Sequence, residues 1–273
     1  MTEGFLGARG IYYRTNDFVA GRPTLVFVHG LSGSSSAWRT YETHFAQECN
    51  VLTYDLRGHG RSTKYPRCRD YAVSCFVDDL EALRADLAIE SCVLVGHSYA
   101  ALVVLEYLRR DQRHVSGVVL LGGEFHPTRH VQAKVLRAVL APVGVLERLP
   151  FHPKPGGHID YRRFVNSGDW NLRRTRADIG NTTWRVLLYC TQHALMVNAE
   201  DVLPALRMPV RLVHGRKDTV FSMTNSTEMA SRIRDADLII LEDADHILVL
   251  NQPRQVAGAI EGLLQRCQAP VPC

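Results

Sequence analysis

Cys92-Val-Leu-Val-Gly-His-Ser-Tyr-Ala100 is the stretch from which the fold can be inferred. It opens with four residues typical of a strand that is buried on both faces of a sheet. The run from Tyr99 to Leu108 is apolar almost all round, which predicts a buried helix. A sharp turn between such a strand and such a helix needs small residues two positions either side of its centre. Gly96 and Ala100 meet this need and make Ser98 a candidate nucleophile.

The same alternation of apolar run and helix-length segment extends along most of the chain. Residues 76–87 and 253–264 have apolar side chains at helical spacing, so both are predicted to be amphipathic helices. This pattern predicts an α/β fold with a mostly parallel sheet and helices on both faces. The predicted strands are residues 25–28, 51–54, 92–95, 115–121, 210–213 and 238–241.

The alternation stops between Glu124 and Leu206, where helical patches and a proline-rich stretch replace it. Proline removes a backbone donor and clashes with the preceding turn, so Pro142, Pro150, Pro153 and Pro155 predict several short helices. We therefore expect a core formed by residues 1–124 and 207–273, with residues 125–206 inserted as a helical cap.

From about Gly21 onward the chain resembles the α/β-hydrolase family. Ala100 is a mild departure, because the usual pattern has glycine at that position of the elbow. The resemblance implies an eight-stranded sheet with the cap inserted after the sixth strand. The motifs that match, in order, are His29-Gly30, Tyr54-Asp-Leu-Arg-Gly-His-Gly-Arg-Ser62, Gly96-His-Ser-Tyr-Ala100, Gly215-Arg-Lys-Asp218 and Asp245-His246.

Two further residues follow late predicted strands. A serine needs an imidazole to accept its proton and a carboxylate to orient that imidazole. Asp218 and His246 lie after the last two strands and complete the chain order Ser, Asp, His that this fold uses. The alternatives are a turn or helix-capping role for Asp218 and a solvated loop position for His246. Because some family members carry the acid after an earlier strand, Glu124 is the reserve candidate.

The resemblance also implies an oxyanion hole, formed by the backbone amides of Leu31 and Tyr99, whose side chains would be free to shape the pocket. We expect His29 to brace its loop through a hydrogen bond and Asp55 to anchor the glycine-containing loop that follows it. Cys190 and His193 have a metal-like spacing, but no second pair accompanies them, so no metal site is predicted.

The predicted cap is rich in arginine and aromatic residues. The arginines could pair with a substrate carboxylate, although a solvated helix face is the favoured interpretation. The aromatic side chains could form an apolar roof over Ser98 or pack the interior of the cap. The residues concerned are Arg162, Arg163, Arg173, Arg174 and Arg176, together with Tyr161, Phe164, Trp170, Trp184 and Tyr189.

Composition narrows the classes of partner. The 273 residues carry a formal net charge of +4, and the basic residues form no block, which argues against nucleic acid as a ligand. The sequence shows no apolar run long enough to span a membrane and no export signal. Seven cysteines without a regular framework suit free thiols. We therefore expect a cytoplasmic protein that acts on a small-molecule substrate without a cofactor.

Together these features predict a serine hydrolase that cleaves a carboxylic ester or thioester of a small, apolar substrate through an acyl-Ser98 intermediate. Carbon–carbon bond hydrolysis of a diketone stays open, because that branch of the family uses the same triad. A small-molecule receptor with slow or no turnover is the alternative from another class. Dehalogenases and epoxide hydrolases are disfavoured, since they have Asp at the position of Ser98.

Overall fold

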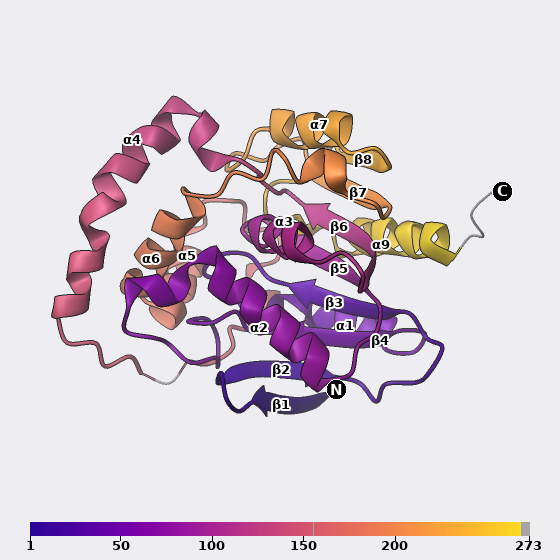
Figure 1. The fold of residues 1–273 in the computed structure, drawn as a ribbon, viewed down its shortest axis with the longest axis horizontal. Coiled ribbons are helices and arrows are strands. Elements are labelled where there is room, and N and C mark those ends of the chain that lie inside the picture. Colours follow the sequence, from indigo (N-terminus) through magenta and orange to yellow (C-terminus); the bar gives the residue numbers. More distant parts are fainter. Residues whose placement is uncertain (155, 269–273) are drawn as a thin grey trace.

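The computed structural model describes residues 1–154 and 156–268 and has one eight-stranded sheet at its centre (Figure 1). Pro155, and Cys273 as one of the seven cysteines of the sequence, lie outside these residues. The order across the sheet is β1-β2-β4-β3-β5-β6-β7-β8. The strands are β1 (Thr2–Leu6), β2 (Ile11–Thr15), β3 (Thr24–Val28), β4 (Asn50–Tyr54), β5 (Cys92–His97), β6 (Val115–Leu121), β7 (Val210–Gly215) and β8 (Ala236–Leu241).

The sheet is mostly parallel, as predicted. All pairings from β4 to β8 are parallel, whereas β1 pairs with β2 and β2 pairs with β4 in antiparallel register. The six strands predicted from apolar runs are present. The first two strands were not predicted, because TEGFL and IYYRT contain polar residues and no helix follows either of them. Strand β1 lies at the edge of the sheet, and β2 lies between β1 and β4.

Helices cover both faces of the sheet, and strand residues alternate between the two cores. In β3, Val26 and Val28 face the core shared with α2 and α3, while Leu25 and Phe27 face the core shared with α1 and α9. This alternation explains why the central strands are apolar throughout. The helices outside the segment between β6 and β7 are η1 (Ser35–Trp38), α1 (Arg39–Phe45), η2 (Cys68–Tyr71), α2 (Val73–Asp86), α3 (Ala100–Arg110), α7 (Met223–Arg232), α8 (Leu248–Asn251) and α9 (Pro253–Gln268).

Residues 125–206, called the insert below, connect β6 to β7 through short helices. Figure 1 shows α4 arching away from the sheet, and none of its residues is buried. None of the helices formed by residues 1–154 and 156–268 has both the length and the apolar character needed to cross a membrane. The helices of the insert are η3 (Pro127–Arg129), α4 (Val131–Leu140), η4 (Ala141–Arg148), η5 (Tyr161–Phe164), α5 (Leu172–Thr182), α6 (Trp184–Ala194) and η6 (Leu203–Ala205).

Candidate active site

Ser98 occupies the turn between β5 and α3. Its φ of 55° lies in the left-handed region, which a non-glycine residue adopts only at an energetic cost. A Cβ atom on Gly96 would lie 3.3 Å from Val104 and 3.4 Å from Ala100, so there is little space beneath the turn. The methyl group of Ala100 fits this space and is fully buried. The departure from glycine at this position is therefore sterically tolerated.

Ser98, His246 and Asp218 form one chain of hydrogen bonds. The Oγ of Ser98 lies 2.8 Å from Nε2 of His246, and Nδ1 of His246 lies 2.8 Å from Oδ2 of Asp218. With the proton of His246 on Nδ1, the imidazole donates to the carboxylate and accepts from the serine hydroxyl. This arrangement can remove the proton of Ser98 as its oxygen attacks an acyl carbon.

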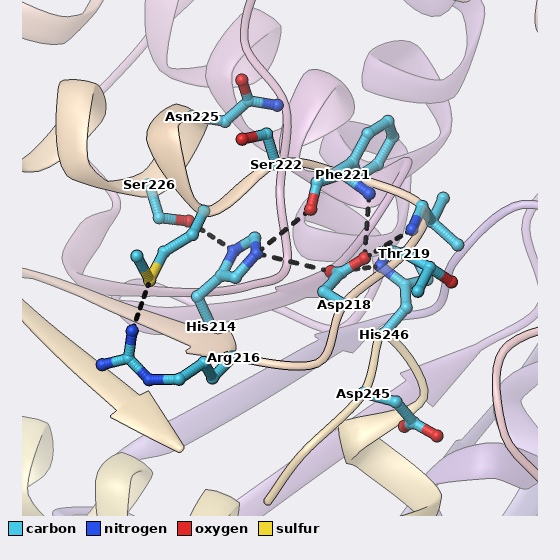
Figure 2. Close-up of polar contacts among 12 residues, drawn as sticks. His214, Arg216, Asp218, Thr219, Phe221, Ser222, Asn225, Ser226, Asp245 and His246 are labelled. Carbon is cyan, nitrogen blue, oxygen red and sulfur yellow. Dashed lines mark hydrogen bonds and ion pairs between the residues drawn. The ribbon is translucent and has the colours of Figure 1, made fainter. Parts of the chain in front are cut away.

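Figure 2 shows the polar contacts of Asp218 in the loop after β7. Its Oδ1 accepts hydrogen bonds from the amides of Val220 and Phe221, both at 2.8 Å. Burial alone would raise the pKa of Asp218, but the hydrogen bond and charge of His246, helped by these two amides, lower it overall. Asp218 therefore combines two roles that appeared as alternatives in the sequence, a turn former through Oδ1 and a partner of His246 through Oδ2.

His97 and Gly122 lie next to His246. His97 donates a hydrogen bond from Nε2 to the backbone carbonyl of His246 at 2.9 Å, and burial lowers the pKa of His97 to about 3, so its ring is neutral. Gly122, with φ at 54°, follows β6, and a Cβ atom there would lie 3.4 Å from both Asp218 Oδ2 and His246 Nδ1. A larger residue at position 122 would crowd this ion pair.

Leu31 and Tyr99 are the residues whose amides are predicted to form the oxyanion hole. Leu31 and Ser98 line one cavity, and Gly30 lies so close that a Cβ atom on it would be 3.3 Å from the Cβ atom of Ser98. Within the described part of the chain, neither amide donates a hydrogen bond. An oxyanion donor must be free in this way, so the observation is compatible with the predicted role of the two N–H groups. The Tyr99 side chain does not shape the cavity, contrary to expectation, because its ring is buried against Phe76.

His29 and Asp55 have the supporting contacts predicted for them. His29 donates from Nδ1 to the Gly30 carbonyl and accepts from the amide of Leu56 at 3.0 Å. The buried carboxylate of Asp55 accepts hydrogen bonds from the amides of Ser35 and Arg61, both at 2.7 Å. It also pairs at 2.8 Å with His158, a residue of the insert whose contact the sequence did not reveal.

Asp169, also in the insert, joins the two loops that carry Asp218 and His246. Its Oδ1 accepts from the amide of His246 at 2.7 Å. Its Oδ2 accepts from the amide and the hydroxyl of Thr219, at 2.9 and 2.7 Å. No motif in the sequence pointed to Asp169, because its partners are 50 or more positions away.

The cavity at Ser98 has a volume of about 90 Å³, and the insert contributes Tyr161, Arg174 and Asp178 to its wall. Arg174 is buried, whereas the other four arginines noted above are exposed. The aromatic residues do not form a common roof. Trp170 and Trp184 are largely exposed, and Tyr189 is buried against Tyr71.

The remaining candidates make other contacts. Oε1 of Glu124 accepts hydrogen bonds from the amides of Phe125 and His126, and Oε2 accepts one from Asn225. Both oxygens of this buried carboxylate therefore have partners other than His246. The Nε2 atom of His193 lies 3.0 Å from the backbone carbonyl oxygen of Cys68, within hydrogen-bond distance. Residues 1–154 and 156–268 contain no cluster of three His, Cys, Asp or Glu side chains that could hold a metal ion.

Comparisons with known proteins agree with this fold. A putative carbamate hydrolase, RutD, from Pseudomonas syringae is 27% identical and covers 90% of this chain and 95% of its own. A pimeloyl-[acyl-carrier protein] methyl ester esterase from Aromatoleum aromaticum is also 27% identical and covers 89% and 99%. The structure of a thermophilic esterase from Thermogutta terrifontis superposes with a TM-score of 0.71 at 22% identity, over 95% of each chain. Residues 23–253 match the α/β hydrolase fold family, and the chain therefore belongs to that family.

Proposed function

We propose that this protein is a serine hydrolase that cleaves a small carboxylic ester or thioester. The observation that carries the proposal is the hydrogen-bonded chain from Ser98 through His246 to Asp218, which opens on a cavity. Ser98 Oγ attacks the acyl carbon while His246 takes its proton, and His246 then gives that proton to the leaving group. Water, activated by the same imidazole, releases the acid and restores Ser98. Asp218 keeps His246 in the required tautomer throughout.

The amides of Leu31 and Tyr99 donate to the oxygen that becomes negative in each tetrahedral intermediate. These donors are fixed before the reaction begins. Donors that need no reorganisation stabilise the transition state most. No metal or organic cofactor has a part in these steps.

We also propose that the insert is a cap, so that residues 1–124 and 207–273 form the hydrolase core and residues 125–206 close the site. Contacts from His158 to Asp55 and from Asp169 to His246 support this division. The small cavity favours a short substrate, since sites for drug-sized ligands span about 300–1,000 Å³. The names of the two relatives, an ester hydrolase and a putative carbamate hydrolase, fit the same class of acyl substrates.

Turnover of short-chain nitrophenyl esters and labelling by a fluorophosphonate probe test this proposal. We expect multiple turnovers that disappear in Ser98→Ala and labelling of Ser98 alone. Absence of labelling on the folded protein would overturn the assignment of Ser98. Ligand binding without turnover would instead support the receptor alternative, and cleavage of a diketone in preference to esters would support carbon–carbon hydrolysis.

A further inference from the structure

The wall of the Ser98 cavity contains a charged pair that the proposed mechanism does not use. Arg174 and Asp178 lie one turn apart on α5, and both line the cavity together with Ser98 and His246. Their exposed fractions are only 7% and 8%. Burying charged groups is costly unless they are paired and hydrogen-bonded, so such residues in a small cavity require a reason.

Arg174 is held in place but only partly satisfied. Its Nη2 donates to the backbone carbonyls of Gly168 and Asp169. Its Nε is buried and has no hydrogen-bond partner, and Nη1 has none among the described residues. A guanidinium has five N–H donors, so the two donors on Nη1 are free for a ligand, whereas the buried Nε–H is not accessible to one.

Asp178 is likewise half-satisfied. Its Oδ1 accepts a hydrogen bond from the hydroxyl of Tyr161 at 2.8 Å, and no described residue donates to its Oδ2. Arg174 and Asp178 also form no ion pair with each other within residues 1–154 and 156–268. A donor and an acceptor are therefore fixed by surrounding contacts, side by side in the cavity, and left open.

We propose that Arg174 and Asp178 form a polar subsite for a neutral carboxamide-like group on the substrate, with its carbonyl oxygen bound by Arg174 and its N–H by Asp178. This inference rests on the proposed ester hydrolysis and names a substrate class for it. An apolar group would leave both side chains unpaired, and a carboxylate would meet the like charge of Asp178. This proposal differs from the expectation of an apolar substrate.

Two sets of isosteric esters test the subsite, because the carboxamide can belong to the acid or to the alcohol. The acid set is methyl succinamate, methyl hemisuccinate and methyl 4-methylpentanoate. The alcohol set contains the acetates of 3-hydroxypropanamide, 3-hydroxypropanoate and 3-methylbutanol. In one set we expect kcat/KM for the carboxamide to exceed that for the branched alkyl ester by about 10-fold or more, since a site built for hydrogen bonds rejects analogues that lack them.

Substitutions test whether the subsite is the cause of a preference for the carboxamide ester. Arg174→Met should abolish the carboxamide preference, whereas Arg173→Met, its exposed neighbour, should retain it. Asp178→Asn replaces the free oxygen with an N–H donor, so it should raise kcat/KM for the carboxylate ester relative to the carboxamide. This second variant tests the proposal even where Arg174→Met fails to fold.

Preference for the alkyl or the carboxylate ester in both sets would overturn the subsite, as would a carboxamide preference that survives Arg174→Met. Where turnover is slow, the six esters can instead be ranked by how strongly each protects Ser98 from labelling by the fluorophosphonate. Labelled enzyme that hydrolyses the six esters without discrimination contradicts the subsite alone. No labelling of Ser98 and no hydrolysis contradict the proposed function as well.

Discussion

At the scale of single residues, the site depends on carboxylates that look alike in the sequence but have different surroundings. Asp218 is stabilised as an anion by His246 and two amides, and its pKa is lowered overall even though burial raises it. Asp178 has one hydrogen bond from Tyr161, and burial raises its pKa to about 6. Both carboxylate oxygens of Glu124 accept structural hydrogen bonds. Environment therefore assigns three different roles to one functional group.

The role of Asp218 leads to the first prediction. Asp218→Asn keeps the shape of the side chain but favours the wrong tautomer of His246, so kcat/KM for a nitrophenyl ester should fall by about 10³–10⁴-fold. Glu124→Gln should leave kcat/KM at the wild-type level, because Glu124 does not contact His246. Steady-state kinetics on both folded variants decide between the two acids. A loss in Glu124→Gln that matches the loss in Asp218→Asn would be incompatible with our assignment.

The raised pKa of Asp178 predicts a dependence of stability on pH. Between its ordinary value of 3.8 and about 6, the folded protein retains a proton that the unfolded chain releases. This group therefore lowers the free energy of unfolding as the pH rises through that range. Asp178→Asn avoids the buried charge and should be more stable than wild type at pH 8, by about 1–3 kcal/mol.

Urea unfolding at pH 8 and pH 4 measures this effect, and the difference between variant and wild type should shrink at the lower pH. Asp160→Asn, a change to an acid at the surface of the insert, is the control and should give no such gain. An equal difference at both pH values would show that packing, and not ionisation, separates Asp178→Asn from wild type.

At the scale of elements, the parallel sheet brings distant residues together at one edge. Ser98, Asp218 and His246 follow β5, β7 and β8, and the carboxyl ends of parallel strands meet on the same side of a sheet. The two loops that carry Asp218 and His246 are joined directly, because the amide of Lys217 donates to the carbonyl of Ala244 at 2.9 Å. Asp169 adds a second link from the insert, by accepting hydrogen bonds from both loops.

Removal of this link should therefore slow chemistry more than it weakens binding. We expect Asp169→Ala to lower kcat by about 10–100-fold with little change in KM, because small displacements of catalytic groups are costly. Asp169→Asn keeps one acceptor oxygen and should recover part of kcat, while Asp201→Ala, at the surface, should match wild type. A higher KM with normal kcat would indicate a role in substrate binding instead.

At the scale of the whole molecule, polar contacts attach the insert to the core. His158 pairs with Asp55, Ser36 donates to the carbonyl of Ile159, and Thr182 donates to the carbonyl of Ser32. Helix α4, by contrast, lies at the periphery without a buried residue (Figure 1). The insert is thus attached to the core by polar contacts, whereas its helix α4 buries no residue.

Loss of one anchor should make the insert open more often. A hydrogen bond to a charged group contributes about 1.5–3 kcal/mol, so His158→Ala should raise the rate of tryptic cleavage at Arg162 and Arg163 by about 10–100-fold. His130→Ala, which changes an exposed histidine of the same insert, is the control. Time courses resolved by mass spectrometry give both rates, and equal rates in the two variants would rule out His158 as an anchor.

Much of the fold and the central residues of the site could be predicted because they depend on local patterns. Apolar runs identified β3 to β8, and small residues around Ser98 identified the elbow. Strands β1 and β2 escaped prediction, because both contain polar residues and neither is a continuous apolar run. The buried position of Arg174 escaped it too, because five arginines in one polar region gave no sign of which would face inward.

The sequence by itself determined the elements, their order and the residue types at the ends of the strands, because neighbouring residues set these through steric fit and hydrophobic periodicity. Only the tertiary structure decided which side chains of the insert reach the site. Asp169, Arg174, Asp178 and His158 acquire their roles from partners distant in the sequence. Their burial depends on how the insert packs against the core, and this packing is a sum of many long-range contacts that no local pattern contains.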